Sequence, residues 1–97
     1  MKRLSLKIAG SPVTVKVSKW TERPKANGIY IRVPSEAEYP LSLIQECIEV
    51  MFNITIDTYV KDRGAHGLYI PEEDATSLEE GTIILGLKKA EARGWLN

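Results

Sequence analysis

The stretch PLSLIQECIEVMFN, residues 40–53, decides how this chain can fold. Its apolar side chains recur every three or four positions, which places them on one face of an α-helix. These side chains are Leu41, Ile44, Cys47, Ile48 and Met51. A helix with one apolar stripe has to bury it, so we expect a sheet to pack against residues 40–53. Asn53 can end this helix in the left-handed conformation.

The segments on both sides of this helix alternate apolar and polar side chains, the period of a half-buried β-strand. We expect strands at residues 3–9, 13–19, 28–33, 54–60 and 68–70. Turn residues 10–12 join the first two strands into a hairpin. The unbroken apolar character of residues 82–85 predicts a further, buried strand.

Two short helical segments complete the prediction. One falls within residues 71–80, with Gly81 as its stop, and one within 87–93, where Gly94 ends the helix and Trp95 and Leu96 fold back. The expected fold is a single α+β domain spanning residues 1–97. Its largely antiparallel sheet has about five to six strands and is covered on one face by the helix at 40–53, with one or two short additional helices.

Composition narrows the classes of protein to which the chain can belong. A hydrophobic content of 43% is ordinary for a soluble globular domain. A single cysteine excludes an internal disulfide framework, and no apolar run approaches the roughly 18 residues of a membrane span. We therefore expect a soluble, cytoplasmic protein that makes no contact with membranes.

The net charge of zero hides an uneven distribution. Residues 1–32 carry eight lysines and arginines and one glutamate, a net charge of +7. Residues 33–80 carry eleven acids and two basic side chains, a net charge of −9. Residues 81–97 return to +2, with three basic side chains and one acid. Such asymmetry is informative about binding partners rather than about fold.

No pattern predicts an enzyme. Cys47 lies on the apolar stripe of the helix, whereas a catalytic cysteine needs a partly exposed, electropositive setting. His66, the only histidine, is expected to be exposed in a glycine-containing loop at residues 61–67. One cysteine and one histidine cannot form a structural zinc site, and no calcium-loop spacing is present. We expect no catalytic residues, no metal and no cofactor.

The acidic residues of the middle segment are the predicted partner-binding site. They are Glu36, Glu38, Glu46, Glu49, Asp57, Asp62, Glu72, Glu73, Asp74, Glu79 and Glu80. Gathered into one face, these carboxylates could replace phosphates on the basic, nucleic-acid-binding groove of a host protein or complex. In size and charge layout the chain resembles the small inhibitors of phages and prophages, above all anti-CRISPR proteins that imitate DNA. That resemblance implies a non-enzymatic inhibitor that acts by protein–protein interaction.

The alternative is a small nucleic-acid-binding or transcription-regulatory protein that uses the basic N-terminal hairpin. Its outward face is expected to carry Lys7, Lys16 and Lys19, with Trp20, Arg23 and Lys25 following in sequence. Residues 69–71 and 78–82 also resemble the strand–Ile-Pro–helix unit of AbrB-type transcription factors, although acids stand where those proteins carry basic side chains. Since the sequence pI is near 6.6, direct nucleic-acid binding is the less favoured prediction.

Overall fold

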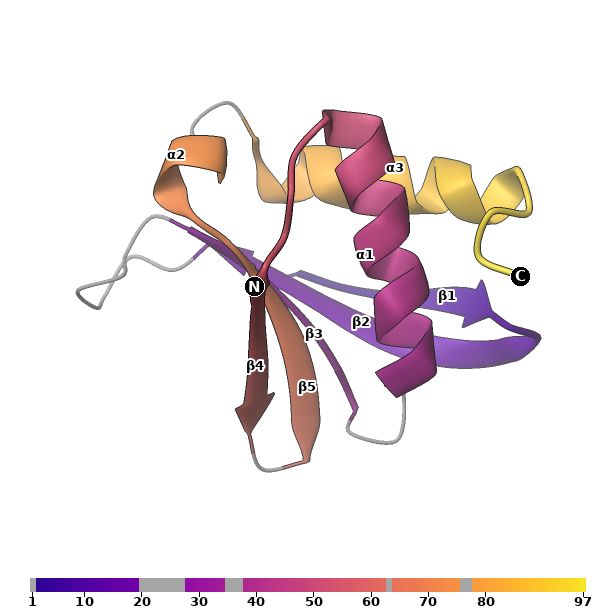
Figure 1. Ribbon diagram of the computed structural model, residues 1–97. Helices are drawn as coiled ribbons and strands as arrows, with labels where there is room; N and C mark the ends of the chain where they lie inside the picture. Colours follow the sequence, from indigo (N-terminus) through magenta and orange to yellow (C-terminus); the bar gives the residue numbers. More distant parts are fainter. Residues whose placement is uncertain (1, 20–27, 35–37, 63, 76–77) are drawn as a thin grey trace.

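The computed structural model describes residues 2–19, 28–34, 38–62, 64–75 and 78–97. Within that part of the chain, five strands form one antiparallel sheet in the order β1-β2-β3-β5-β4 (Figure 1). The strands are β1 (Lys2–Ile8), β2 (Ser11–Lys19), β3 (Ile29–Pro34), β4 (Thr58–Asp62) and β5 (Ala65–Ile70). The helices are α1 (Glu38–Phe52), α2 (Glu72–Ala75) and α3 (Glu80–Ala92). The predicted α+β class is confirmed.

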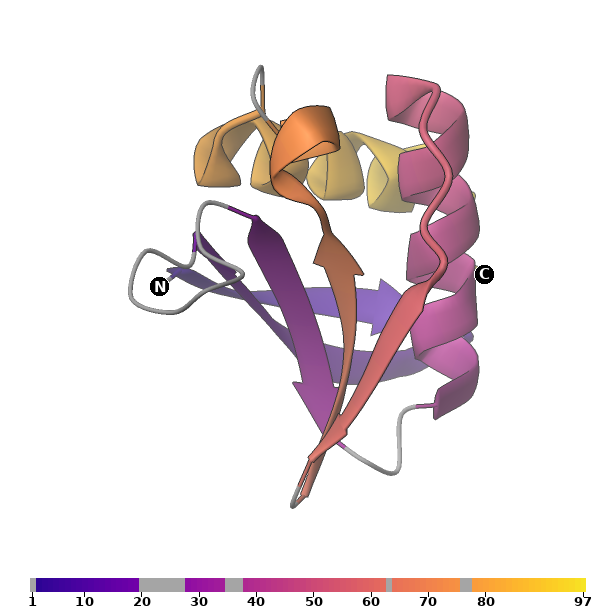
Figure 2. The same cartoon turned by 60° about the vertical axis from the view of Figure 1, so that its left-hand side comes forward.

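The core lies between one face of the sheet and the two longer helices. Figures 1 and 2 show α1 and α3 on the same face, with α3 against β1 and β2 and α1 against β3 and β5. Alternate side chains of the first three strands point into this layer and are buried. They are Leu4, Leu6, Ile8, Val13, Val15, Val17, Ile29, Ile31 and Val33. No helix in the described part of the chain covers the opposite face, which we name the open face.

The N-terminal hairpin is confirmed, and its turn begins one residue earlier than predicted and is two residues long rather than three. Ile8 pairs with Ser11, so the connection consists of Ala9 and Gly10 alone. Both residues have positive φ angles, 51° and 85°. A two-residue turn with two positive φ values matches the right-handed twist of the strands that it joins.

The predicted main helix is confirmed as α1, which begins two residues before its predicted start. Pro40 is the third residue of α1. Amide groups in the first helical turn have no partner within the helix, so proline is tolerated there. Leu41, Ile44 and Ile48 are fully buried against the sheet, and Asn53 follows the helix with φ 53°, as expected.

The strand predicted at residues 82–85 is wrong, because this segment belongs to α3. Ile83, Leu87 and Ala90 follow one another at helical spacing and are all fully buried. Gly81, predicted to stop a helix, lies instead in the first turn of α3, and the preceding helix α2 is a single turn. The longer helical stripe buries more apolar surface than a short strand could, and this outweighs the β-branched character of the segment.

The strand predicted at residues 54–60 is displaced toward the C-terminus. Only β4, Thr58–Asp62, pairs with β5. The residues before β4 are held by side chains of α1. The Glu49 carboxylate accepts the N–H of Ile56 at 2.7 Å, and the Gln45 side-chain amide donates to the carbonyl of Ile56 at 2.8 Å. His66, predicted in a loop, pairs with Lys61 within the sheet. The polar side of α1 thus takes the place of a strand partner.

Both ends of α3 are tied to the N-terminal hairpin through backbone amides. The Glu80 carboxylate accepts the N–H of Lys19 at 2.8 Å, and the Glu91 carboxylate accepts the N–H of Lys7 at 2.6 Å. The Leu96 carbonyl accepts the N–H of Ala9 at 2.8 Å. Of these three donors, the Lys7 amide belongs to the edge strand β1, and its bond occupies a donor that this edge would otherwise offer to another chain.

Candidate functional site

The eleven predicted partner-binding acids are spread over several elements. Glu36 lies outside the described residues, and so do the side chains of Glu38, Asp62 and Glu72. The remaining seven come from α1, from the segment before β4, from α2 and from the start of α3. They are Glu46, Glu49, Asp57, Glu73, Asp74, Glu79 and Glu80.

Glu49 and Glu80 are among the acids that have structural partners within the described part of the chain. Glu49 and Glu80 are half-buried, and each accepts a backbone N–H, from Ile56 and Lys19 respectively. A carboxylate that satisfies a backbone amide stabilises the fold and offers less of its charge to a partner protein. Their sequence positions did not reveal these bonds, because the amides become neighbours only after folding.

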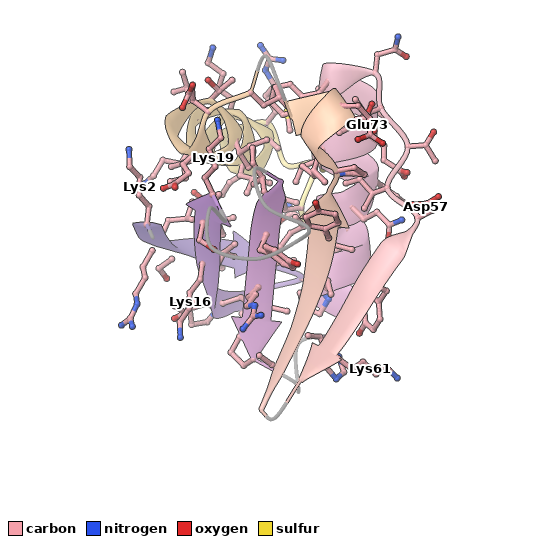
Figure 3. All side chains as sticks on the ribbon, turned by 90° about the vertical axis from the view of Figure 1, so that its left-hand side faces the viewer. Lys2, Lys16, Lys19, Asp57, Lys61 and Glu73 are labelled. Atoms are coloured by element: carbon pink, nitrogen blue, oxygen red, sulfur yellow. The ribbon has the colours of Figure 1, made fainter. Side chains whose placement is uncertain are left out.

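The separation of charge along the sequence is only partly kept in space, because the Glu80 carboxylate bonds to the Lys19 amide and Lys61 lies near β4 (Figure 3). In Figure 3, Lys2, Lys16 and Lys19 lie on the side of β1 and β2, whereas Asp57 and Glu73 lie on the opposite side, near β4 and α2. Glu46 is exposed on α1, where it lines a shallow groove together with residues of α1 and the C-terminal turn. The described acids therefore occupy at least two surfaces.

Cys47 and His66 have different neighbours. The Cys47 thiol lies 3.9 Å from the backbone carbonyl of Trp95 and is largely buried. The Nδ1 atom of His66 lies 2.6 Å from the hydroxyl of Tyr59. Burial, and secondarily the Glu46 carboxylate, raises the pKa of the Cys47 thiol above its ordinary value. A nucleophilic cysteine needs the opposite shift.

We expect the Cys47 thiol to react slowly with iodoacetamide at pH 8 in the folded protein and rapidly in denaturant. Folding raises the pKa of the Cys47 thiol, so its neutral form stabilises the folded state. This stabilisation is complete below the ordinary thiol pKa of 9.0 and is lost as the pH rises through the pKa of the folded state. Mass spectrometry over time measures the alkylation. Equal rates with and without denaturant would contradict the burial of this thiol.

The described residues include no cluster of three or more His, Cys, Asp or Glu side chains that could hold a metal ion. None of the helices in the described ranges is long and apolar enough to span a bilayer.

Pairing across the first three strands brings cationic side chains together on the open face. Arg3 of β1 lies opposite Lys16 of β2, and Lys16 lies opposite Arg32 of β3. Directly opposed residues in an antiparallel sheet project from the same face. Arg3, Lys16 and Arg32 therefore form one row across the sheet, which we name the cationic row.

No family model matches this sequence, and no curated protein or solved structure does either. The chemistry of its surfaces is therefore the basis for any assignment of function.

The sequence predicted only part of the cationic row. Lys16 was expected on the outward face, and its register agrees with that expectation. Lys19, also expected there, lies opposite the buried Ile29 and thus belongs to the helix-covered side. Arg3 and Arg32 contributed only to the charge count, because their alignment with Lys16 depends on the pairing register of three strands.

Two tyrosines lie beside the cationic row. Tyr30 of β3 lies opposite Tyr69 of β5, and their ring centroids are 4.7 Å apart with an interplanar angle of 40°. The guanidinium carbon of Arg32 lies 5.7 Å from the centre of the Tyr30 ring. Tyr30 is half-buried, whereas Tyr69 is only 8% exposed. The open face thus combines positive charge with a partly exposed aromatic ring, over which the Arg32 guanidinium lies.

Proposed function

We propose that this protein is a non-enzymatic binding protein that holds nucleic acid on the open face of its sheet. The observation that carries the proposal is the cationic row. Neighbouring strands lie about 4.8 Å apart, so the register of Arg3, Lys16 and Arg32 concentrates three positive charges within about 10 Å. Lysine and arginine side chains that neutralise phosphates supply most of the sequence-independent affinity for nucleic acids.

The overall charge of zero is compatible with this role. Exposed charges are largely screened from one another beyond roughly 8 to 10 Å at ordinary ionic strength. Asp57 and Glu73 lie on the other side of the molecule from Lys16 (Figure 3). Asp57 and Glu73 therefore contribute little to the field that a phosphate at the cationic row would experience.

The cationic row predicts a defined salt dependence. For three phosphate contacts with a single strand, the logarithm of affinity should fall with the logarithm of salt concentration with a slope of about −2. That slope corresponds to about a 20-fold loss between 50 and 200 mM salt. Fluorescence anisotropy with labelled homopolymeric DNA and RNA oligonucleotides measures it. The triple variant Arg3→Glu/Lys16→Glu/Arg32→Glu should abolish binding at every salt concentration.

The matched control is Lys88→Glu/Lys89→Glu/Arg93→Glu, which makes the same change in net charge on exposed residues of α3 and the turn after it. This variant should retain nearly all of the affinity. An equal loss in both triple variants would refute the cationic row as the binding surface, as would no binding at low salt. Circular dichroism of each variant verifies that the fold is intact.

The second candidate is the predicted inhibitor of the anti-CRISPR kind, docking an acidic surface onto a basic groove of a host complex. It is favoured by Asp57 and Glu73, which lie on one side of the molecule, away from the labelled lysines of β1 and β2 (Figure 3). Glu49 and Glu80 accept hydrogen bonds from backbone amides, so their charge contributes less to this acidic surface. The titration above separates the candidates, since an acidic inhibitor would leave oligonucleotides unbound.

A further inference from the structure

The aromatic pair on the open face has a rigid support. Gly28 leaves the space in which the Tyr69 ring lies, because a Cβ atom at Gly28 would overlap that ring. The Tyr69 ring fills the space beside Gly28 and contacts the Tyr30 ring. Tyr30 is the less buried member of this pair, and the buried Tyr69 ring supports it.

The residue next to Arg32 on β5 is also a glycine. Gly67 lies opposite Arg32, and a Cβ atom at Gly67 would lie 3.2 Å from the Arg32 Cγ atom and 3.1 Å from the Ile31 carbonyl. The aliphatic part of the Arg32 side chain therefore lies beside the backbone of Gly67 rather than beside a side chain. As a result, residue 67 places no side chain beside the Tyr30 ring, and the group that lies over this ring is the Arg32 guanidinium.

The dimensions of the sheet discriminate between double-stranded and single-stranded ligands. Five strands span about 19 Å, whereas the major groove of DNA is about 12 Å wide. The open face cannot enter a groove, so a duplex could touch it only with phosphates and would leave the Tyr30 ring without a base. A single strand exposes the faces of its bases, which stack on aromatic side chains.

We propose that the ligand of the open face is single-stranded nucleic acid: one base stacks on the Tyr30 ring in the place taken here by the Arg32 guanidinium, which turns with Lys16 and Arg3 to the neighbouring phosphates. This inference rests on the proposed function and specifies its ligand. The nucleic acid crosses the sheet from β3 toward β1, because the cationic row runs in that direction from the tyrosine pair. Stacking is tolerant of base identity, so sequence preference is weak.

The test compares Tyr30→Leu, Tyr30→Phe and the wild type in anisotropy titrations. The ligands are single-stranded DNA, single-stranded RNA and a duplex of equal length. Tyr30→Leu should weaken single-strand binding roughly 5- to 150-fold, the range observed when a stacking aromatic side chain is removed. The salt slope should not change, because no phosphate contact is lost. Tyr30→Phe keeps the aromatic face and should bind nearly as tightly as the wild type.

The control is Tyr59→Leu, which removes a 40% exposed tyrosine from the other face of the sheet and should leave affinity unchanged. Equal affinity for the duplex, or no effect of Tyr30→Leu, would overturn the single-strand inference while leaving nucleic-acid binding by the cationic row intact. Displacement by polyglutamate as effectively as by oligonucleotide would also overturn it, since the face would then accept any polyanion. Failure to bind any oligonucleotide would refute the proposed function itself.

Discussion

Replacing Leu87 with alanine is expected to lower the free energy of unfolding by about 2 to 5 kcal/mol. Leu87 is fully buried in the layer between α3 and the sheet. Truncation removes its apolar contacts and leaves a cavity that the surrounding side chains fill only partly. For a domain of this size, such a loss corresponds to a fall in melting temperature of about 10 to 30 °C. Urea unfolding followed by circular dichroism measures the change.

The matched control is Leu85→Ala on the same helix. Leu85 is 55% exposed, so the same chemical change should alter stability by no more than about 0.5 kcal/mol. The pair also tests the helical assignment of residues 80–92. If Leu85→Ala proved as costly as Leu87→Ala, the buried face of α3 would have to be different from the one described.

Replacing Gly28 with alanine is expected to have the second largest effect on stability. The added methyl group would overlap the Tyr69 ring, which has to shift and thereby changes its contact with Tyr30. Overpacking of this kind costs about 1 to 3 kcal/mol. The same change should weaken oligonucleotide binding if Tyr30 is the stacking residue, because its support shifts. Thermal unfolding and anisotropy titration of one preparation measure both effects.

Gly81→Ala supplies the control for the chemical change itself. The atom nearest to a Cβ at Gly81 is the Lys2 ammonium at 3.8 Å, an ordinary contact. Alanine in the first turn of α3 should therefore be neutral or stabilising by up to about 1 kcal/mol.

A second control makes the Gly28→Ala change in a Tyr69→Ala background. The loss of stability caused by Gly28→Ala should largely disappear there, since the clashing ring is absent. If Gly28→Ala still lowered stability in that background, the added methyl group would have to clash with an atom outside the Tyr69 ring.

Local patterns were sufficient to predict several elements. At residues 40–53 the apolar side chains recur at helical spacing, and this pattern predicted the helix α1 correctly. In residues 3–9 and 13–19 they alternate with polar side chains, and this pattern predicted the strands β1 and β2 correctly. Residues 82–85 were misassigned because a short apolar run fits either a strand or a buried helix. The helical stripe becomes visible only when Ile83 is considered together with Leu87 and Ala90.

The candidate site was less predictable than the fold. Sequence asymmetry showed that positive and negative charges differ in their positions along the chain, but it could not assign them to surfaces. Arg3, Lys16 and Arg32 are far apart in the chain, and only strand pairing makes them neighbours. Likewise, Glu80 was predicted to bind a partner, yet its carboxylate bonds to the Lys19 amide in the folded chain.

The amino-acid sequence by itself determined the α+β class, the N-terminal hairpin and the amphipathic helix α1, because hydrophobic periodicity is a property of neighbouring residues. The tertiary structure alone decided which basic side chains share a surface, which acids are used to satisfy backbone amides, and which face of the sheet remains open. Those features depend on pairing register and helix placement. Both are set by the burial of the whole core rather than by any local segment.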